Sequence, residues 1–149
     1  MKEPRSKVVL LQCKNYDVEL VRDKIKLGLG LLGGLKQLVK PGEKILLKPN
    51  LLAPDPPETA TATQPVVFRA AAEILQDHGA VIYYGDSPGI HSTTKVLKKC
   101  GLQEVADELR LLPADFETRE KVFYYYGSWI SWKKPCYVSD KLGCFPNFF

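Results

Sequence analysis

The chain has 149 residues, of which 45% are hydrophobic and 26% are charged, a composition typical of a single globular domain. Its net charge of +4 is small and spread along the chain, without the clustered arginines and interleaved aromatic residues expected of a nucleic-acid groove. No apolar run approaches the roughly 20 residues of a membrane-spanning helix, and the N-terminus lacks a secretory signal, so we expect a cytoplasmic protein that binds neither nucleic acid nor membranes.

Two strands joined by a helix are predicted in the first third of the chain. Residues 7–12 form an apolar run typical of a strand that is covered on both faces. Asn15 is the expected cap of a helix whose apolar stripe continues to the glycines at 33–34. A Pro-Gly turn then leads into residues 44–48, which have the pattern of a second buried strand.

The middle of the chain continues this alternation. Pro65 suits the first position of a helix, and Gly79 ends that helix before a third strand at residues 80–84. Ser92 is a suitable cap for a further helical region, which Gly101 interrupts. The order β-α-β-α-β-α predicts the α/β class, with a three-layer Rossmann-like parallel sheet that is incomplete in this chain.

A glycine motif in the first helix resembles a dinucleotide-binding fingerprint. Gly28, Gly30 and Gly33 match the pattern G-x-G-x-x-G. The fingerprint functions in the tight turn between a strand and the N-terminus of a helix, whereas these glycines lie at the far end of a helix. We therefore expect them to weaken the helix end and to permit close packing, not to bind a nucleotide.

Two unusual loops leave the carboxyl ends of predicted strands. Residues 48–63, KPNLLAPDPPETATAT, follow the second strand, and residues 85–89, GDSPG, follow the third. Loops at the carboxyl ends of parallel strands gather at one edge of the sheet, where ligands bind in open α/β folds. The helix N-termini that follow favour an anion, so the expected ligand is an anionic small molecule or a metal-containing one.

Lys48 and Asp86 are the charged residues expected to matter most in these loops. The Lys48 ammonium can meet a carboxylate or a phosphate, or it can simply be solvated. Asp86 is the candidate catalytic residue, because a carboxylate at the end of a buried strand can bind a metal, orient a hydroxyl group or act as a base. The alternative for Asp86 is a side chain that caps its own turn.

Four further polar residues of the loops are candidates for ligand binding. Asn50 can bond a ligand or, as the favoured alternative, the loop backbone. Thr61 and Thr63 direct their hydroxyls the same way if the segment is extended, and helix capping is their alternative role. Ser87 has no histidine that can be assigned to it, which argues against a nucleophilic triad.

Three separated motifs resemble, in this order, the family known as domain of unknown function 362: PGEKILLKPNLL at 41–52, TATQP at 61–65 and GDSPG at 85–89. The resemblance extends roughly over residues 7–116. It implies a cytoplasmic protein in a redox setting, often with iron–sulfur ferredoxin modules attached and with no established activity. The motif residues that it assigns to the candidate site are Lys48, Pro49, Asn50, Asp86, Ser87 and Gly89, joined through a weaker match by Thr61 and Thr63.

The cysteines do not complete a metal motif. The chain has four cysteines without a C-x-x-C pair, which argues against a zinc ribbon or a complete iron–sulfur motif, so the cofactor is left open. The family resemblance allows an iron–sulfur cluster in full-length relatives. Two of them, Cys13 and Cys100, are expected to be small buried apolar residues.

The chain changes character after residue 116. Residues 1–116 are interpreted as the N-terminal part of an α/β domain, and residues 117–149 as an aromatic-rich tail without helical or strand periodicity. Eleven of the fifteen aromatic residues lie from Phe116 onward. A truncation or a shifted reading frame explains such a tail, and a tail that binds a partner is the alternative. An incomplete sheet would also promote self-association.

Three functions are compatible with these patterns. The first is a redox-associated enzyme or maturation domain that binds an anionic or metal-containing ligand at the two loops, with a ferredoxin-like protein as an expected partner. The second is a non-catalytic binding or scaffold module, and the third is an inactive fragment. Whether the protein is an enzyme is left open by the sequence.

Overall fold

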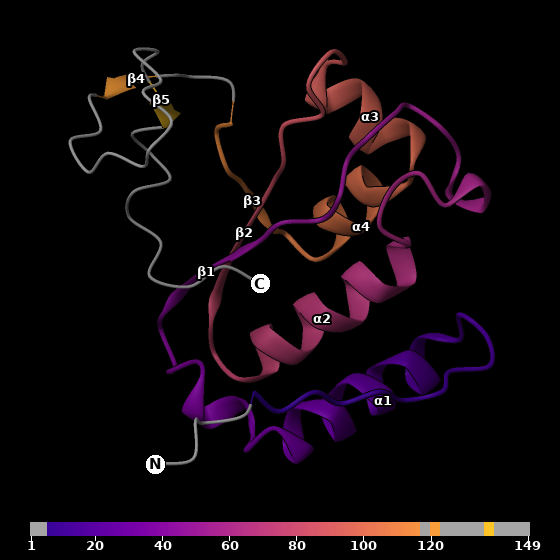
Figure 1. Ribbon diagram of the computed structural model, residues 1–149, viewed down its shortest axis with the longest axis vertical. Helices are drawn as coiled ribbons and strands as arrows, with labels where there is room; N and C mark the ends of the chain where they lie inside the picture. The colour runs from indigo at the N-terminus through magenta and orange to yellow at the C-terminus, as the bar shows by residue number, and fades with distance from the viewer. Residues whose placement is uncertain (1–5, 117–119, 123–135, 139–149) are drawn as a thin grey trace.

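The centre of the fold is a parallel sheet of three short strands (Figure 1). The computed structural model describes residues 6–116, 120–122 and 136–138. The strands are β1 (Lys44–Leu47), β2 (Val81–Tyr84) and β3 (Leu112–Pro113), and β2 lies between the other two. This arrangement confirms the predicted α/β class and the Rossmann-like parallel sheet.

Among the described residues, four α-helices accompany the sheet: α1 (Val18–Leu31), α2 (Pro65–Asp77), α3 (Thr93–Lys99) and α4 (Leu102–Glu108). Short 3-10 helices occupy Leu35–Gln37 and Pro57–Thr59. Helix α2 packs against the sheet, and α1 packs against α2 on the side away from the sheet (Figure 1). Helix α4 also contacts α2, and α3 contacts α4.

Ion pairs reinforce the contacts between helices. Arg22 of α1 pairs with Asp77 of α2, and Arg69 of α2 pairs with Glu108 of α4. Glu73 lies within 4 Å of both arginines, at 3.8 Å from Arg22 and 3.7 Å from Arg69. These pairs are partly exposed, so they add little to stability compared with the apolar core.

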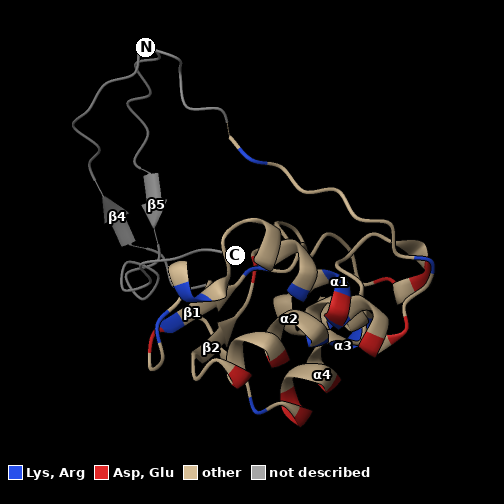
Figure 2. Ribbon diagram, turned by 90° about the horizontal axis from the view of Figure 1, so that it is seen from below, with Lys and Arg blue, Asp and Glu red and all other residues tan. Residues whose placement is uncertain are grey.

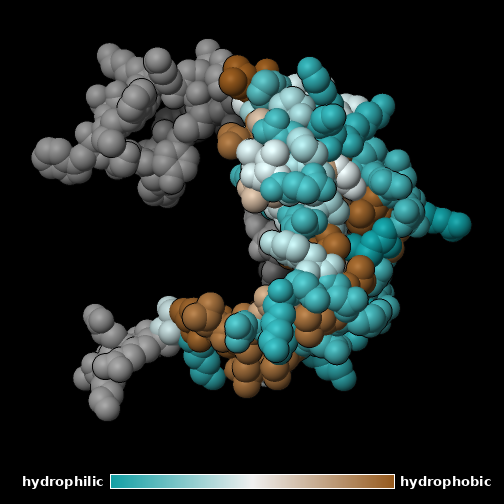
Figure 3. Space-filling view, turned by 90° about the vertical axis from the view of Figure 1, so that its right-hand side faces the viewer, coloured by the Kyte–Doolittle hydropathy of each residue, from teal (hydrophilic) through white to brown (hydrophobic). Residues whose placement is uncertain are grey.

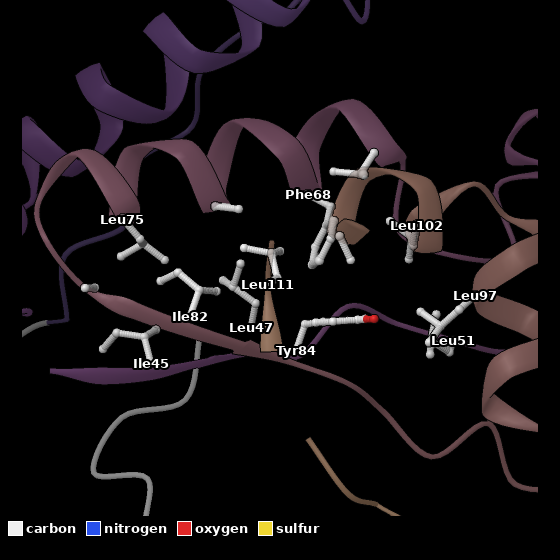
Figure 4. Close-up of a cluster of buried hydrophobic side chains, with 14 of the residues drawn as sticks. Ile45, Leu47, Leu51, Phe68, Leu75, Ile82, Tyr84, Leu97, Leu102 and Leu111 are labelled. Atoms are coloured by element: carbon white, nitrogen blue, oxygen red, sulfur yellow. The ribbon is translucent and has the colours of Figure 1, made fainter. Parts of the chain in front are cut away.

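The hydrophobic core lies between α2 and the sheet (Figure 4). Ile45 and Leu47 point into it from β1 because side chains two residues apart share one face of a strand. Phe68 of α2 meets Tyr84 of β2 edge to face, with ring centroids 6.0 Å apart. Leu102 brings α4 into the same core and is fully buried.

Proline and glycine mark the helix boundaries as predicted. Pro65 is the first residue of α2, with Gln64 as the cap residue. Gly79 and Gly101 follow α2 and α3 with φ angles of +86° and +78°, which residues other than glycine rarely adopt. The predicted break between α3 and α4 is therefore confirmed.

Residues 7–12 do not form the predicted first strand. Val8 and Leu10 are 88% and 96% exposed, whereas Val9 and Leu11 lie beside Gly28 of α1. The segment is thus covered on one side by a helix instead of being paired within the sheet. The third strand of the sheet is β3, which follows α4, so the observed order begins with a helix and ends with a strand.

The start of α1 also differs from the prediction. Its cap is Asp17, whose carboxylate accepts a hydrogen bond from the Leu20 amide at 2.9 Å. Asn15 lies two residues earlier and accepts a hydrogen bond from the Asp17 amide at 3.2 Å. Both are good capping types, and periodicity alone does not separate positions that lie two residues apart.

The glycine motif lies where the sequence predicted. Gly28 and Gly30 belong to α1, and Gly33 follows its C-terminal end. The N-terminus of α1 lies at the opposite end of the helix, so the glycines do not form the phosphate-binding turn of a dinucleotide site.

The C-terminal region includes two further strands. β4 (Glu120–Val122) and β5 (Cys136–Val138) pair antiparallel, although the sequence of this region shows no strand periodicity. The remainder of residues 117–149 lies outside the described residues, so the proposed domain division and the interpretations of the tail stay predictions.

Exposed apolar side chains gather on residues 7–12 and α1. Figure 3 shows this hydrophobic surface at the end of the molecule that carries the N-terminus. None of the described helices is both long and apolar enough to cross a membrane. Self-association through the edge of an incomplete sheet, which is a different surface, stays a prediction. The large apolar residues exposed in these segments and at the end of α1 are Val8, Leu10, Leu27, Leu31 and Leu32.

Two buried titratable groups predict a loss of stability at alkaline pH. Burial raises the pKa of Cys100 above its ordinary value of 9.0, partly opposed by backbone hydrogen bonds. Burial and the Asp107 charge raise the pKa of Tyr84 above 10.0, opposed by the Gln103 hydrogen bond. The folded chain therefore holds these protons more tightly than the unfolded chain, and their contribution is complete below the unfolded pKa values.

We expect the free energy of unfolding in urea to fall as the pH rises above about 9. Combining Tyr84→Phe with Cys100→Ala should flatten this part of the profile. Tyr16→Phe is the matched control, because Tyr16 is 60% exposed. A profile equally steep in the double variant and the original chain would refute the assignment.

Candidate functional site

The predicted site residues of the two loops meet at the carboxyl edge of the sheet. Lys48 follows β1 directly, and Asp86 lies two residues beyond the end of β2. The parallel pairing of Leu47 with Tyr84 brings these strand ends to the same level. The Lys48 ammonium lies 2.7 Å from Oδ1 of Asp86, so the carboxylate that the sequence allowed for Lys48 is supplied by the chain itself.

Asp86 connects the two loops. It is 6% exposed, and its Oδ2 accepts a hydrogen bond of 2.9 Å from the backbone amide of Leu51. Leu51 is itself 2% exposed, so this amide has little access to water. Both carboxylate oxygens therefore have partners within the chain, and Asp86 holds residues 48–51 against the end of β2.

Asn50, Thr61 and Thr63 fold the first loop back on itself. The backbone N–H of Asn50 donates to the Thr63 hydroxyl at 2.8 Å, and the backbone N–H of Thr63 donates to the backbone carbonyl of Asn50 at 3.0 Å. The Asn50 side chain donates to the Thr61 carbonyl at 3.1 Å. Leu51 and Ala62 add an isolated antiparallel bridge. Asn50 thus has the loop-stabilising contacts that the sequence favoured. They hold the beginning of the loop, at residues 50–51, beside its end, at residues 61–63.

Thr63 lies beside the N-terminus of α2 without capping it. Gln64 is the cap residue, and its side chain makes no capping hydrogen bond. The Thr63 hydroxyl is instead engaged with Asn50. Because the loop folds back on itself, Lys48, Asn50 and the N-terminus of α2 lie together at the carboxyl edge of the sheet.

Ser87 and Gly89 are less closely integrated. Both residues are exposed, and among the described residues no hydrogen bond joins Ser87 or Gly89 to Lys48 or Asn50. Gly89 has a φ angle of +76°, which explains a glycine in the turn without invoking a ligand. Their assignment to the site stays a prediction.

Lys48 retains capacity for a ligand. Its side chain is 48% exposed, in contrast to 8% for Asp86. An ammonium group has three N–H donors, and the ion pair with Asp86 occupies one of them. An anion can therefore approach Lys48 from solvent while Asp86 remains in place.

The described residues do not fit an iron–sulfur cluster. They contain no group of three or more His, Cys, Asp or Glu side chains that could hold a metal ion. Cys100 is buried as expected, whereas Cys13 is exposed, contrary to the prediction for it.

Two cavities are hollowed into the described part of the fold. The larger, about 500 Å³, lies between residues 9–16 and α1, away from the sheet edge. The second, about 340 Å³, opens beside the ends of β2 and β3. Neither is lined by any predicted site residue, so the sequence did not reveal the second cavity. Its polar side chains are Tyr84, Thr93, Thr94, Gln103 and Asp115.

Comparison with known proteins identifies the family. Residues 45–140 match the family described as Domain of unknown function (DUF362). The chain belongs to this family. The match begins in β1 and reaches residue 140, whereas the sequence motifs suggested residues 7–116.

A curated relative supports the same assignment. Thylakoid-associated protein sll1697 from Synechocystis sp. is 33% identical over 109 residues, which cover 73% of this chain. The aligned part is 34% of that protein, so the chain spans about a third of its length. No solved structure is significantly similar to the chain.

Proposed function

We propose that this DUF362 chain is a binding domain whose ligand is an anionic small molecule held at the Lys48 and Asp86 loops. The proposal concerns the loops 48–63 and 85–89, which lie at the carboxyl edge of the sheet. The observation that carries it is the asymmetry of the Lys48–Asp86 pair, in which the acid is buried and the base is half exposed. The ammonium end of this ion pair therefore faces solvent, while the carboxylate end is buried.

The contacts of Asp86 favour a positioning role over a catalytic one. A general base or metal ligand needs an oxygen that can reach the substrate or the metal, whereas both oxygens of Asp86 are engaged by Lys48 and Leu51. Asp86 fixes the direction of the Lys48 ammonium instead. An anion is accordingly favoured over a metal-containing ligand, and a non-catalytic binding module over an enzyme.

A redox association is a weaker part of the proposal. It rests on the family resemblance, and we place any iron–sulfur cluster on a ferredoxin-like partner, since the described residues offer no ligand set for it. The cytoplasmic location is also proposed. The relative is named as thylakoid-associated, so cell fractionation of the native protein should test whether this chain remains in the soluble fraction.

Lys48→Gln is expected to weaken the binding of inorganic phosphate, the simplest anionic probe. Glutamine retains a hydrogen-bond donor for Asp86 but loses the positive charge, so the fold should persist while the affinity falls roughly tenfold. Isothermal titration calorimetry at low ionic strength measures the change. The matched control is Lys95→Gln, an exposed lysine on α3.

Equal phosphate affinity in the original chain and Lys48→Gln would reject the anion site. An inactive fragment, the remaining alternative, predicts no binding in either protein. Circular dichroism of both variants distinguishes a lost site from a lost fold.

A further inference from the structure

The extended segment at residues 7–14 turns apolar side chains toward solvent. Side chains alternate along an extended backbone, and Val9 and Leu11 face α1. The alternate residues Val8 and Leu10 therefore point away from the helix and are almost fully exposed. One face of this segment is thus packed, and the other is apolar without being covered.

Helix α1 extends this apolar surface. Leu27 and Leu31 are four residues apart, so they share one face of the helix, and each is about half exposed. Together with residues 7–12 they form the hydrophobic surface that is visible in Figure 3. Exposed apolar surfaces of this kind mark contacts with a partner molecule or with lipid.

Lysines flank the apolar side chains, and the segments that carry them lack acidic residues. Residues 7–14 and 24–42 contain no aspartate or glutamate. Of the 21 basic residues of the chain, the other 15 lie elsewhere together with all 17 acidic residues, so these two segments account for the positive net charge. The six lysines of the two segments are Lys7, Lys14, Lys24, Lys26, Lys36 and Lys40.

These lysines are accessible to an external partner. Five of them are exposed and Lys24 is half-buried, and the ion pairs found among the described residues involve none of the six. Lys14 and Lys24 line the cavity of about 500 Å³ together with Val9 and Leu11, so charged and apolar side chains share one surface. Figure 2 shows the molecule from the side of α1, with the acidic residues of α4 on the opposite side of the picture from residues 7–14.

An anionic lipid bilayer fits this combination better than a protein partner does. Lysine is depleted at protein–protein interfaces relative to the rest of the surface. At a bilayer, by contrast, the ammonium groups stay among the headgroups while the lysine stems cover apolar surface. Apolar side chains then enter the boundary between headgroups and acyl chains, and anionic lipids attract the lysines.

We propose that the surface formed by residues 7–14 and 24–42 binds peripherally to an anionic lipid bilayer. The sequence expectation of no membrane partner rested on the lack of a spanning run, and a contact at the bilayer surface requires no such run. Lys48 belongs to neither segment, so the proposal does not depend on the proposed anion site.

Sedimentation of the full chain with sucrose-loaded vesicles tests the proposal. One set of vesicles contains phosphatidylcholine with about one third phosphatidylglycerol, and the other contains phosphatidylcholine alone. We expect the partition coefficient to be roughly tenfold higher for the anionic vesicles and to fall as salt is added, because salt screens the lysines. Equal partition into the two sets would overturn the proposal.

Lys26→Gln combined with Lys36→Gln should lower partition into the anionic vesicles roughly tenfold. The matched control is Lys98→Gln with Lys99→Gln, which removes the same charge from exposed positions on α3. We expect this control to remain within about twofold of the original chain. Equal losses in the two double variants would mean that the net charge, and not this surface, determines binding.

Val8→Asn combined with Leu10→Asn tests the apolar part of the contact. We expect a loss of roughly tenfold, because two side chains no longer enter the bilayer boundary. Ile90→Asn is the control, since Ile90 is 92% exposed in the second loop. Unaltered partition of a folded Val8→Asn/Leu10→Asn protein would contradict the proposal.

Two further outcomes would assign the binding elsewhere. If the chain is a dimer in analytical ultracentrifugation and Val8→Asn/Leu10→Asn dissociates it without changing vesicle binding, a second copy occupies the surface and the proposal is wrong. Lys48→Gln should weaken phosphate binding and leave vesicle partition within about twofold. Loss of vesicle binding in Lys48→Gln alone would place the lipid phosphate in the proposed anion site and would also refute the surface contact.

Discussion

Asp86→Ala lowers the free energy of unfolding by about 2–4 kcal/mol. The substitution leaves the Leu51 amide without its acceptor in a position that is 2% exposed, and an unsatisfied buried donor costs about 1–3 kcal/mol. It also removes the partner of Lys48. Because the Lys48 side chain is half exposed, water compensates that second loss in part.

Asp86→Asn separates the two contributions. The asparagine side chain still offers an oxygen to Leu51 but has no negative charge for Lys48, so we expect a loss of only about 1 kcal/mol. Asp55→Ala is the control for a carboxylate in the same region, expected to change stability by less than about 0.5 kcal/mol. Urea denaturation measures all three. An Asp86→Ala protein as stable as the Asp55→Ala control would show that Asp86 does not hold the loop.

Ile45→Ala is expected to have an effect at least as large, about 2–5 kcal/mol. Ile45 is fully buried in β1 beneath α2, and its truncation removes apolar contacts and leaves a cavity in the core (Figure 4). The control is Leu52→Ala, because Leu52 follows the same strand but is 60% exposed.

The chemical denaturation midpoint decides the outcome for Ile45. Ile45→Val, with an expected loss of about 0.5–1.5 kcal/mol, gives a graded result if the alanine variant does not fold. Equal midpoints for Ile45→Ala and Leu52→Ala would mean that the core does not lie between β1 and α2.

Local signals in the sequence predicted most of the elements. Pro65, Gly79 and Gly101 act within their own turns, and the structure places each at the predicted helix boundary. The strand predicted at residues 44–48 corresponds to β1, which ends at Leu47 and whose three apolar side chains are buried. Such features depend on neighbours within a few residues, which the sequence shows directly.

The first predicted strand failed for a non-local reason. Residues 7–12 have the composition of a buried strand, but a strand also needs a backbone partner, and composition does not specify one. In the structure the segment packs on Gly28 of α1 while Val8 and Leu10 are exposed. The same limit explains why β3, with only two residues, was not distinguished from the segment around it.

The candidate site was predicted in its location more than in its roles. The position of Lys48 and Asp86 after parallel strands was enough to bring them together. The backbone amide of Leu51 was not predicted as a partner of Asp86. Every residue except proline has a backbone N–H group, so the residue type does not show which of them donates to a carboxylate. The cavity lined by Thr93, Gln103 and Asp115 was missed since it requires three separate segments to converge.

The central claim is that an anion binds Lys48 while Asp86 keeps its loop in place. Titration of the isotope-labelled chain with inorganic phosphate, followed by amide chemical shifts, tests it most directly. We predict saturable shifts concentrated in residues 48–51, 61–66 and 85–89, together with a persistent Leu51 hydrogen bond. Shifts that are absent from these three segments, or confined to α1, would contradict the account.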